Sequence, residues 1–324
     1  MDPFGRKIDY LRISVTDRCN ERCLYCMPEG YKGWESKPDH LTAAEIVRVA
    51  RVAAGLGFRK FRLTGGEPLV RGDVSEIVRA MTAIRGVKTV ALSTNGMKLA
   101  ALAQPLRDAG LRSVNVSLDA MDPEIYHRIT GGDVARVLAG IRAAEAAAFE
   151  RVKLNCVLMR GVNEQEIWPL VLFAAEHGLP LRLIELMPLT TTDVLTEKNF
   201  LPCGEAMRML AQKDELIPQP DRKLGNGPAQ YYLLKQTGAL VGFIGALTNQ
   251  HFCDNCNKMR LTADGKVRPC LGNHAEVDLR AALRHGADDG ALKELLETAL
   301  RLKPQEHQFR NQYQPCRPMT AIGG

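Results

Sequence analysis

The stretch IDYLRISVTDRCNERCLYC, residues 8–26, joins a strand pattern to three closely spaced cysteines. Apolar and polar residues alternate over its first half, as in a β-strand with one buried face. Cys19, Cys23 and Cys26, here called the N-terminal trio, follow with the spacing CxxxCxxC. Three thiols suit a zinc site completed by a distant ligand, or an iron–sulfur cluster with one iron left open. Structural zinc sites usually pair two similar CxxC hooks, so this spacing favours the cluster.

Strand and helix patterns alternate from this stretch onward, in six units that end near residue 190. The strand patterns are IDYLRISV, KFRLTG, KTVALST, RSVNVSLD, RVKLNCVLM and LPLRLIEL. A closed barrel has eight such units, so the sequence predicts an α/β fold with an incomplete parallel (β/α)6 TIM-like barrel. Beyond this the rhythm breaks into two strand patterns, a cysteine segment and two Ala/Leu-rich helices. We therefore expect a barrel over residues 1–200 and a C-terminal α+β region over residues 201–324.

Composition places the chain in a broad class. With 324 residues, 45% hydrophobic and 25% charged, it can bury one large core or a core with an appendage. It lacks an apolar run long enough to span a membrane and the apolar core of a secretion signal, so we expect a cytoplasmic protein with no membrane partner. Nine cysteines in such a compartment favour metal ligation over disulfides. The net charge of +6, without a basic run, suits an anionic small molecule as well as nucleic acid.

The predicted strands also show which side chains face the barrel interior. Helices must cover the apolar face of each strand, so the polar face points inward. The inward residues are Arg12, Ser14, Arg62, Thr64, Asn115, Ser117, Asp119, Lys153 and Asn155. An ordinary barrel fills its interior with Val, Ile and Leu, and charges there would lack partners. The pattern predicts a polar, anionic ligand in the interior; alternatively, these side chains lie at strand ends in water or pair with one another.

The cysteine loop resembles the signature of the radical S-adenosylmethionine superfamily, which has an aromatic residue before the last cysteine, here Tyr25. GGEP, residues 65–68, resembles a second element of that superfamily, although alone it could be an ordinary tight turn. The resemblance implies a [4Fe–4S] cluster on the N-terminal trio, with S-adenosylmethionine on the open iron. One-electron reduction would then release a 5′-deoxyadenosyl radical. The implied contacts to S-adenosylmethionine are Tyr25, Gly66, Ser117 and Met187.

A second cysteine group lies in HFCDNCNKMRLTADGKVRPCL, residues 251–271. It supplies Cys253, Cys256 and Cys270, here called the C-terminal trio. On spacing alone, a zinc site completed by His251, His274 or Cys316 is as good an interpretation as an open cluster. The segment resembles the second-cluster motif of the GTP 3′,8-cyclase family, also called the molybdenum cofactor biosynthesis protein A family. This resemblance runs through the whole chain, from LRISVTDRCN through LTGGEPLVR, STNG, VSLDA and MP to IGG.

The family resemblance implies a second [4Fe–4S] cluster on the C-terminal trio, whose open iron would receive guanine. The implied GTP contacts are Arg12, Arg62, Thr94, Lys153, Lys258, Met259 and Arg260, with Arg182 as a weaker candidate. Lys258 stands where the family usually has Arg. A bidentate guanidinium contact to phosphate or guanine would therefore become a contact from a single ammonium group. Gly323 and Gly324 match a family tail that enters the active site, whereas a glycine pair at a terminus can also be a flexible end.

The resemblance also implies the reaction and its partners. The product would be (8S)-3′,8-cyclo-7,8-dihydroguanosine 5′-triphosphate, formed by a lyase at the first step of molybdenum cofactor biosynthesis. An electron donor such as flavodoxin or ferredoxin and a downstream cyclic pyranopterin monophosphate synthase are implied, a homodimer is allowed, and no nucleic acid is expected. Two rivals are a two-cluster radical enzyme acting on a peptide or RNA, and a zinc protein that binds nucleic acid. Cys156 and Cys203 fit structural roles, and Cys316 has no assigned role.

Overall fold

The computed structural model describes residues 1–27, 39–189, 198–222, 224–225, 227–311 and 313–323. Its strands are β1 (Tyr10–Ser14), β2 (Lys60–Thr64), β3 (Thr89–Thr94), β4 (Ser113–Ser117), β5 (Arg151–Leu158), β6 (Leu181–Glu185), β7 (Leu216–Pro218), β8 (Gln230–Leu234), β9 (Leu240–Ile244), β10 (Lys258–Leu261), β11 (Lys266–Arg268) and β12 (Val277–Asp278). Its α-helices are α1 (Ala43–Gly55), α2 (Val74–Thr82), α3 (Leu99–Asp108), α4 (Pro123–Thr130), α5 (Val134–Ala146), α6 (Ile167–Glu176), α7 (Cys203–Ala211), α8 (Leu279–Arg284), α9 (Asp289–Arg301) and α10 (Met319–Ile322). Short 3-10 turns lie at Pro68–Val70 and Glu164–Glu166.

The described strands form one sheet in the order β12-β11-β10-β1-β2-β3-β4-β5-β6-β9-β8-β7. Strands β1 to β6 are parallel neighbours, which confirms the incomplete (β/α)6 barrel. The C-terminal part of the chain extends both edges: β10 pairs in parallel with β1, and β9 pairs in parallel with β6. The parallel part of the sheet therefore contains two strands that no βα repeat in the sequence marks. The expected boundary near residue 200 stays a prediction.

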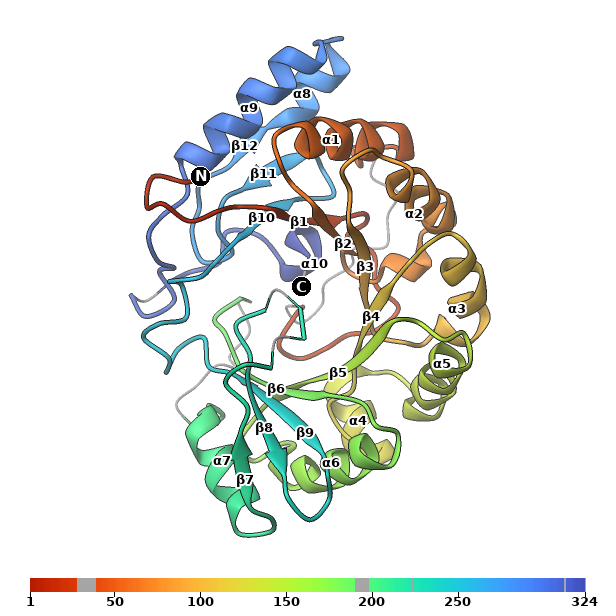
Figure 1. The fold of residues 1–324 in the computed structure, drawn as a ribbon, viewed down its shortest axis with the longest axis vertical. Coiled ribbons are helices and arrows are strands. Elements are labelled where there is room, and N and C mark those ends of the chain that lie inside the picture. Colours follow the sequence, from red (N-terminus) through yellow and green to blue (C-terminus); the bar gives the residue numbers. More distant parts are fainter. Residues whose placement is uncertain (28–38, 190–197, 223, 226, 312, 324) are drawn as a thin grey trace.

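Helices α1 to α6 lie along the outside of the curved sheet (Figure 1). Helix α1 illustrates why. Thr42 caps its N-terminus in a capping box with Glu45, and its buried residues recur at helical spacing from Ile46 to Ala54. That apolar stripe packs on the outward face of the strands, where Leu11 and Ile13 are fully buried. The short helix α10 lies inside the curve (Figure 1).

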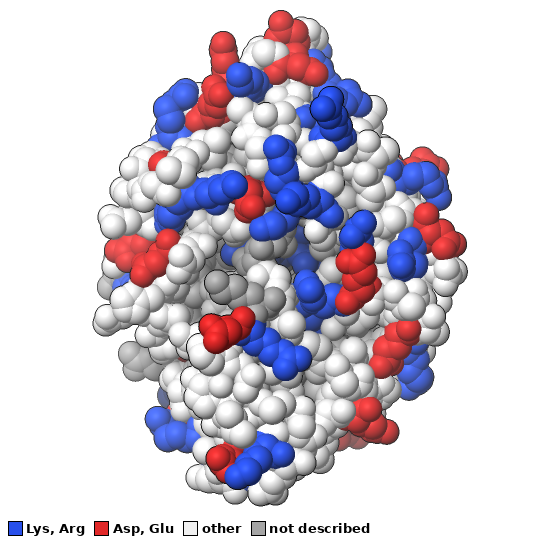
Figure 2. Space-filling view, in the orientation of Figure 1, with Lys and Arg blue, Asp and Glu red and all other residues white. Residues whose placement is uncertain are grey.

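The inner face of the sheet carries the predicted polar side chains. Arg62 is 7% exposed and Lys153 is 3% exposed, and both lie deep in the fold. Thr64, Asn115 and Asp119 are buried on the same face. Figure 2 shows Lys and Arg side chains gathered around the central hollow, among a few acidic ones. The prediction of a polar interior is therefore confirmed for the described residues, and the hollow of the barrel is the place to look for a binding site.

Strand register puts the two cysteine trios at opposite ends of this hollow. The N-terminal trio follows β1, at the C-terminal end of the parallel strands. Strand β10 runs parallel to β1 with Tyr10 opposite Lys258, so Cys256 lies near the N-terminal end of β1. Strand β11 turns back antiparallel along β10, which returns Cys270 to that same end. The inward side chains of β1 and β10 thus lie between the two trios.

Candidate active site

The loop of the N-terminal trio is held by backbone hydrogen bonds. The Cys26 amide donates to the Cys23 carbonyl at 3.0 Å, which forms a tight turn between two of the thiols. The amides of Arg22 and Leu24 donate to carbonyls at the end of α4, at 2.6 and 2.9 Å. The three cysteines are all of intermediate exposure as residues. The loop is therefore positioned by the barrel before any cofactor binds.

Gly65 and Gly66 form the floor beneath this loop. Their neighbours explain the glycines: a Cβ on Gly65 would lie 2.3 Å from the Thr16 carbonyl oxygen, and a Cβ on Gly66 would lie 2.3 Å from that of Arg18. The amide of Gly66 donates to the Thr16 carbonyl at 2.8 Å. The GGEP turn and the cysteine loop thus pack backbone to backbone. The predicted contact of Gly66 with S-adenosylmethionine stays a prediction, but the paired glycines already have a structural reason.

Glu67 of the same turn organises its neighbours. Its buried carboxylate accepts hydrogen bonds from the Thr94 hydroxyl at 2.7 Å and from the amides of Leu69 and Asn95. Burial raises the pKa of Glu67 to about 7 despite these bonds. The hydroxyl of Thr94, a residue predicted to bind GTP, is therefore already engaged as a hydrogen-bond donor to Glu67. The Asn95 side-chain amide lies 3.9 Å from the Cys19 sulfur, which links this network to the trio.

Tyr25 and Asp119 form a second network beside the trio. The Tyr25 hydroxyl donates to Asp119 Oδ2 at 2.6 Å, and the Val157 amide donates to Asp119 Oδ1 at 2.8 Å. Burial raises the pKa of Asp119 to about 6. Ser117, at the end of β4, and Met187, after β6, lie partly buried at the C-terminal ends of their strands. The predicted S-adenosylmethionine residues thus come from strand ends on the same side of the barrel as the N-terminal trio.

Thiol chemistry at the N-terminal trio fits a metal cluster. Burial raises the pKa of Cys26 to about 12, and burial also raises the pKa of Cys19 and of Cys23. Thiols held neutral in this way need bound cations to become the thiolates that iron binds. Within the described ranges, no three Cys, His, Asp or Glu side chains are placed to hold one metal ion. A four-iron cluster uses a different geometry, because each cysteine binds its own iron.

Three arginines stand side by side across the inner face. Arg12 of β1 lies in register with Arg62 of β2 on one side and Arg260 of β10 on the other; we call them the arginine row. Like charges on adjacent strands repel, which makes such a row unfavourable without an anion. Arg62 donates to the Tyr10 hydroxyl at 2.6 Å and to the Leu92 carbonyl at 2.5 Å. The buried Nε of Arg12 has no hydrogen-bond partner among the described residues.

Strands β5 and β6 add two more cations to the hollow. Burial lowers the pKa of Lys153 to about 6, and burial lowers that of Arg182 to about 10. Arg182 has two buried guanidinium nitrogens without a partner in the described part of the chain. The Lys153 ammonium donates to the Leu224 carbonyl, in the segment before β8. Buried cations whose nitrogens lack partners indicate a site for a polyanion.

The C-terminal trio is assembled around the β10–β11 hairpin. The Cys256 amide donates to the Cys253 carbonyl at 3.0 Å, and Cys270 follows β11. Burial raises the pKa of Cys253 and of Cys270. For Cys256, burial acts in the same direction, but the nearby charges of Lys303 and Lys258 outweigh it and lower the pKa. Sequence reasoning did not single out Lys303, because nothing near it in the sequence marks a metal site.

The candidate zinc ligands make other contacts. His251 Nδ1 lies 2.9 Å from Asp254 Oδ2, on the surface. His274 Nδ1 lies 3.1 Å from the Cys316 sulfur, and the His274 ring stacks on Tyr313 at 4.8 Å between centroids. Cys156 and Cys203 are buried among apolar residues, as predicted for structural cysteines.

The remaining predicted substrate residues divide by strand face. On β10, the side chains of Lys258 and Arg260 share the polar side, whereas Met259 is fully buried in the apolar core. The Met259 side chain therefore faces away from the hollow, and a contact with GTP would have to use its main chain. Gly323 lies inside the hollow, where its carbonyl accepts a hydrogen bond from Arg260. Gly324 lies outside the described residues.

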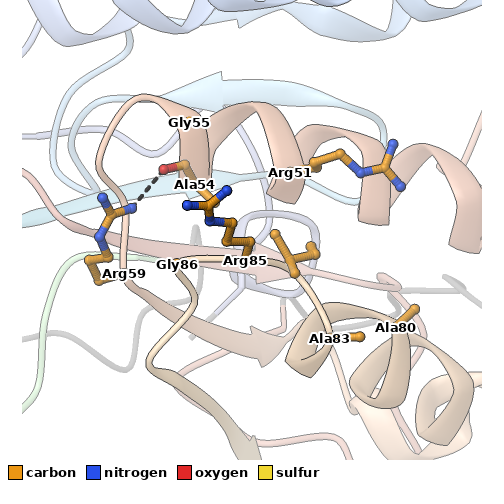
Figure 3. A pocket seen from close by; sticks show the side chains of 9 residues that line it. Arg51, Ala54, Gly55, Arg59, Ala80, Ala83, Arg85 and Gly86 are labelled. Carbon is orange, nitrogen blue, oxygen red and sulfur yellow. Dashed lines mark hydrogen bonds between the residues drawn. The ribbon is translucent and has the colours of Figure 1, made fainter.

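A pocket of about 600 Å³ lies apart from this hollow, in the helix layer. Figure 3 shows Arg51, Arg59 and Arg85 around it, with Arg59 donating to the Ala54 carbonyl at 2.7 Å. It is lined by the C-terminal parts of α1 and α2, on the outer side of the sheet. None of the predicted site residues lines it.

Comparisons with known proteins identify the family. The family model described as the radical SAM superfamily matches residues 13–174, and the one described as Molybdenum Cofactor Synthesis C matches residues 179–309. A GTP 3′,8-cyclase of Moorella thermoacetica is 45% identical over 324 residues, which is 100% of this chain and 99% of that relative. The chain belongs to the GTP 3′,8-cyclase family.

Other members of the GTP 3′,8-cyclase family match over the same length. Those of Pelotomaculum thermopropionicum and Pseudomonas aeruginosa are 43% and 42% identical, and each match spans 100% of this chain and 99% of the relative. As a radical SAM enzyme of this family, the protein uses S-adenosylmethionine and a [4Fe–4S] cluster. No helix among the described residues is long and apolar enough to cross a membrane.

Solved structures agree with this member of the GTP 3′,8-cyclase family in fold. Streptococcus suis SuiB bound to S-adenosylmethionine has a TM-score of 0.59 at 15% identity, covering 90% of this chain and 68% of SuiB. The structure of anSMEcpe with bound AdoMet has a TM-score of 0.60 at 15% identity, covering 93% of this chain and 82% of that one. At this identity the likeness supports the radical SAM architecture alone.

Proposed function

We propose that this protein converts GTP to (8S)-3′,8-cyclo-7,8-dihydroguanosine 5′-triphosphate, the first step of molybdenum cofactor biosynthesis, in the hollow between its two cysteine trios. The observation that carries the proposal is the arginine row: Arg12, Arg62 and Arg260 stand in register on three adjacent strands, with a trio beyond each end of those strands. A nucleoside triphosphate supplies the negative charge that this row lacks. A nucleoside triphosphate also carries a base at the end opposite its phosphates. It can therefore present different groups to the two ends of the site, each of which has its own cysteine trio.

The N-terminal trio would hold the catalytic [4Fe–4S] cluster, and Tyr25, Gly66, Ser117 and Met187 would surround S-adenosylmethionine. When bound, the cluster and S-adenosylmethionine would supply a 5′-deoxyadenosyl radical, which would take the ribose 3′ hydrogen of GTP and leave as 5′-deoxyadenosine. Bonding of carbon 3′ to carbon 8 would open the double bond between carbon 8 and N7, and one further electron from the reductant and one proton would complete the dihydro product. The position of the trio after β1, at the C-terminal end of the parallel strands, supports this assignment.

The C-terminal trio would hold a second [4Fe–4S] cluster that binds guanine. Its support is the donor set: three thiols, one of which has a lowered pKa, beside the polar side of β10. The GTP site would be completed by Lys258, Arg260, Lys153 and Thr94, with Gly323 at its edge; Gly324, predicted to join it, lies outside the described residues. Holding both reacting carbons in one orientation can contribute about 7–11 kcal/mol toward the barrier. Excluding water from the buried hollow protects the radical.

Several partners belong to this proposal. The one-electron reduction needs a donor such as flavodoxin or ferredoxin, and the cyclised nucleotide would pass to a cyclic pyranopterin monophosphate synthase. The basic face around the hollow in Figure 2 suits an acidic donor. A homodimer, a cytoplasmic location and the absence of a nucleic acid partner stay predictions.

The test is a reaction under oxygen-free conditions. Reduced, reconstituted protein is incubated with S-adenosylmethionine and GTP, and the products are identified by mass. We expect 5′-deoxyadenosine and the cyclised nucleotide in equal amounts. Formation of 5′-deoxyadenosine without the cyclised nucleotide would reject GTP cyclisation while keeping the radical chemistry. Stimulation of cleavage by a peptide or RNA, but not by GTP, would favour the rival radical enzyme.

A further inference from the structure

Two cationic side chains, Lys303 and Arg6, connect the segments that carry the C-terminal trio. Lys303 follows α9 and is 3% exposed. Its ammonium donates to the Lys258 carbonyl and to the Pro269 carbonyl, each at 2.8 Å. Lys258 lies two residues after Cys256, and Pro269 directly precedes Cys270. One side chain therefore ties together the two arms of the hairpin that bring these thiols to the same end of the barrel.

Arg6 makes the matching connection on the other side of the trio. Its guanidinium donates to the Cys253 carbonyl at 3.0 Å and to the carbonyls of Pro304 and Gln305, each at 2.6 Å. Through Arg6, the segment that follows Lys303 is thus linked to Cys253, the remaining cysteine of the trio. Together the two side chains, from positions far from the trio in the sequence, contact the backbone at or next to all three cysteines.

The charge of Lys303 has no carboxylate partner in the described part of the chain, unlike that of Arg6, which pairs with Asp2 at 2.7 Å. A buried ammonium that contacts only neutral carbonyls is unfavourable, unless an anion lies nearby. The nearest anions would be the thiolates of the trio, because the ammonium binds the carbonyl of Pro269, which directly precedes Cys270, and that of Lys258, two residues after Cys256. A cluster held by three thiolates is negative, and it gains a further negative charge on reduction.

We propose that Lys303 is a positioning residue of the C-terminal trio: with Arg6 it holds the three cysteines in place, and its charge raises the reduction potential of the cluster bound there. This inference rests on the second cluster of the proposed function. Net charge, burial and hydrogen bonding set the potential of an iron–sulfur cluster, and a buried cation stabilises the more negative, reduced form.

The test isolates the second cluster in the full chain. Replacing Cys19, Cys23 and Cys26 by Ala removes the first cluster, so that iron and the redox signal report on the C-terminal trio alone. In this background, Lys303→Gln keeps a hydrogen-bond donor but loses the charge, whereas Lys303→Arg keeps the charge. Lys293→Gln is the matched control, because Lys293 lies exposed on α9 with only a 3.9 Å ion pair to Glu297.

Iron content and the midpoint of an oxygen-free redox titration are measured for each variant. We expect Lys303→Gln to lower the ratio of reduced to oxidised cluster at fixed potential at least tenfold, a shift of about 59 mV for a one-electron couple. Lys303→Arg and Lys293→Gln should stay close to the background. If Lys303→Gln loses its iron and Lys303→Arg keeps it, the requirement for the charge is supported as well.

An unmoved midpoint in Lys303→Gln at full iron content would overturn the inference alone, as would loss of iron from both Lys303 variants. Arg6→Gln serves as a second variant and should shift the midpoint in the same direction by less, because Asp2 already balances its charge. Absence of iron in the unsubstituted background would instead reject the second cluster, and the inference with it.

Discussion

Replacing Arg12 should stabilise the ligand-free protein and weaken GTP binding. Arg12 stands between Arg62 and Arg260 on adjacent strands, and its buried Nε has no partner among the described residues. Burial lowers the pKa of Arg12 to about 10, which reflects how poorly the empty hollow accommodates its charge. Arg12→Met removes that charge, keeps an unbranched side chain and leaves no hydrogen bond of the Nε atom broken.

The size of the effect follows from charge repulsion across the strands. Two like charges about 6–8 Å apart repel by roughly 2–3 kcal/mol at an effective dielectric constant of ~20. Arg12 has two such neighbours, and halving the sum for water in the hollow leaves about 2–3 kcal/mol. At roughly 2 °C per kcal/mol for a chain of this size, the ligand-free melting temperature should rise by about 4–6 °C. Losing one charged contact to phosphate costs about 2–5 kcal/mol, a 30- to 5,000-fold loss of GTP affinity.

The assay compares thermal unfolding without ligand and equilibrium GTP binding for the wild type, Arg12→Met and Arg79→Met. Arg79 is exposed on α2 and serves as the matched control, with little change expected in either quantity. The reasoning would be refuted if Arg12→Met melted below the wild type and still bound GTP within about twofold of it. That result would mean that Arg12 is a structural residue whose charge is balanced inside the fold.

Two further predictions concern the packing of the cysteine loop and the proton taken up when GTP binds. Gly66→Ala should lose iron from the N-terminal trio, because its Cβ would lie 2.3 Å from the Arg18 carbonyl oxygen, whereas Gly72→Ala, with open space around it, should keep its iron; equal iron content in both would contradict the packing argument. GTP binding should take up close to one proton at pH 7.5, because burial lowers the pKa of Lys153 to about 6 and a bound triphosphate favours the charged ammonium. Affinity should therefore fall by up to about tenfold per pH unit above pH 6 while that uptake lasts. Calorimetry in buffers of different ionisation enthalpy measures the uptake, which Lys153→Met should abolish; an unchanged uptake in that variant would assign the proton elsewhere.

Local patterns were enough to predict the barrel and its polar interior. Alternation with a period of two separates Arg62 and Lys153 from the apolar faces of their strands, and both side chains are buried in the polar interior. Cys156 was placed on the apolar side by the same reasoning. The spacing of the cysteines is also local, so the two trios could be read directly from the sequence.

Long-range pairing could not be predicted in the same way. Strand β10 pairs with β1 across more than 240 positions, and no residue in either strand marks the other as its neighbour. The arginine row therefore appears only in the structure, because it needs the register of three strands. Lys303 is a similar case: it acts through carbonyl groups of Lys258 and Pro269, which every residue type possesses.

Two residues carry roles that their motifs conceal. Gly66 belongs to a cofactor motif, yet its close approach to the Arg18 carbonyl already requires glycine. Met259 lies between two cationic residues of a binding motif, yet its side chain is fully buried in the core. A motif groups residues that are neighbours in sequence, whereas a strand sends alternate side chains to opposite faces.

The central claim is that the hollow holds GTP between the two trios with its ribose facing the N-terminal one. The most direct measurement uses GTP deuterated at carbon 3′ and follows the mass of the 5′-deoxyadenosine formed in a single turnover. The account predicts 5′-deoxyadenosine that carries one deuterium, in an amount equal to the cyclised nucleotide. Unlabelled 5′-deoxyadenosine in the same yield would contradict it, because another hydrogen would then face the radical.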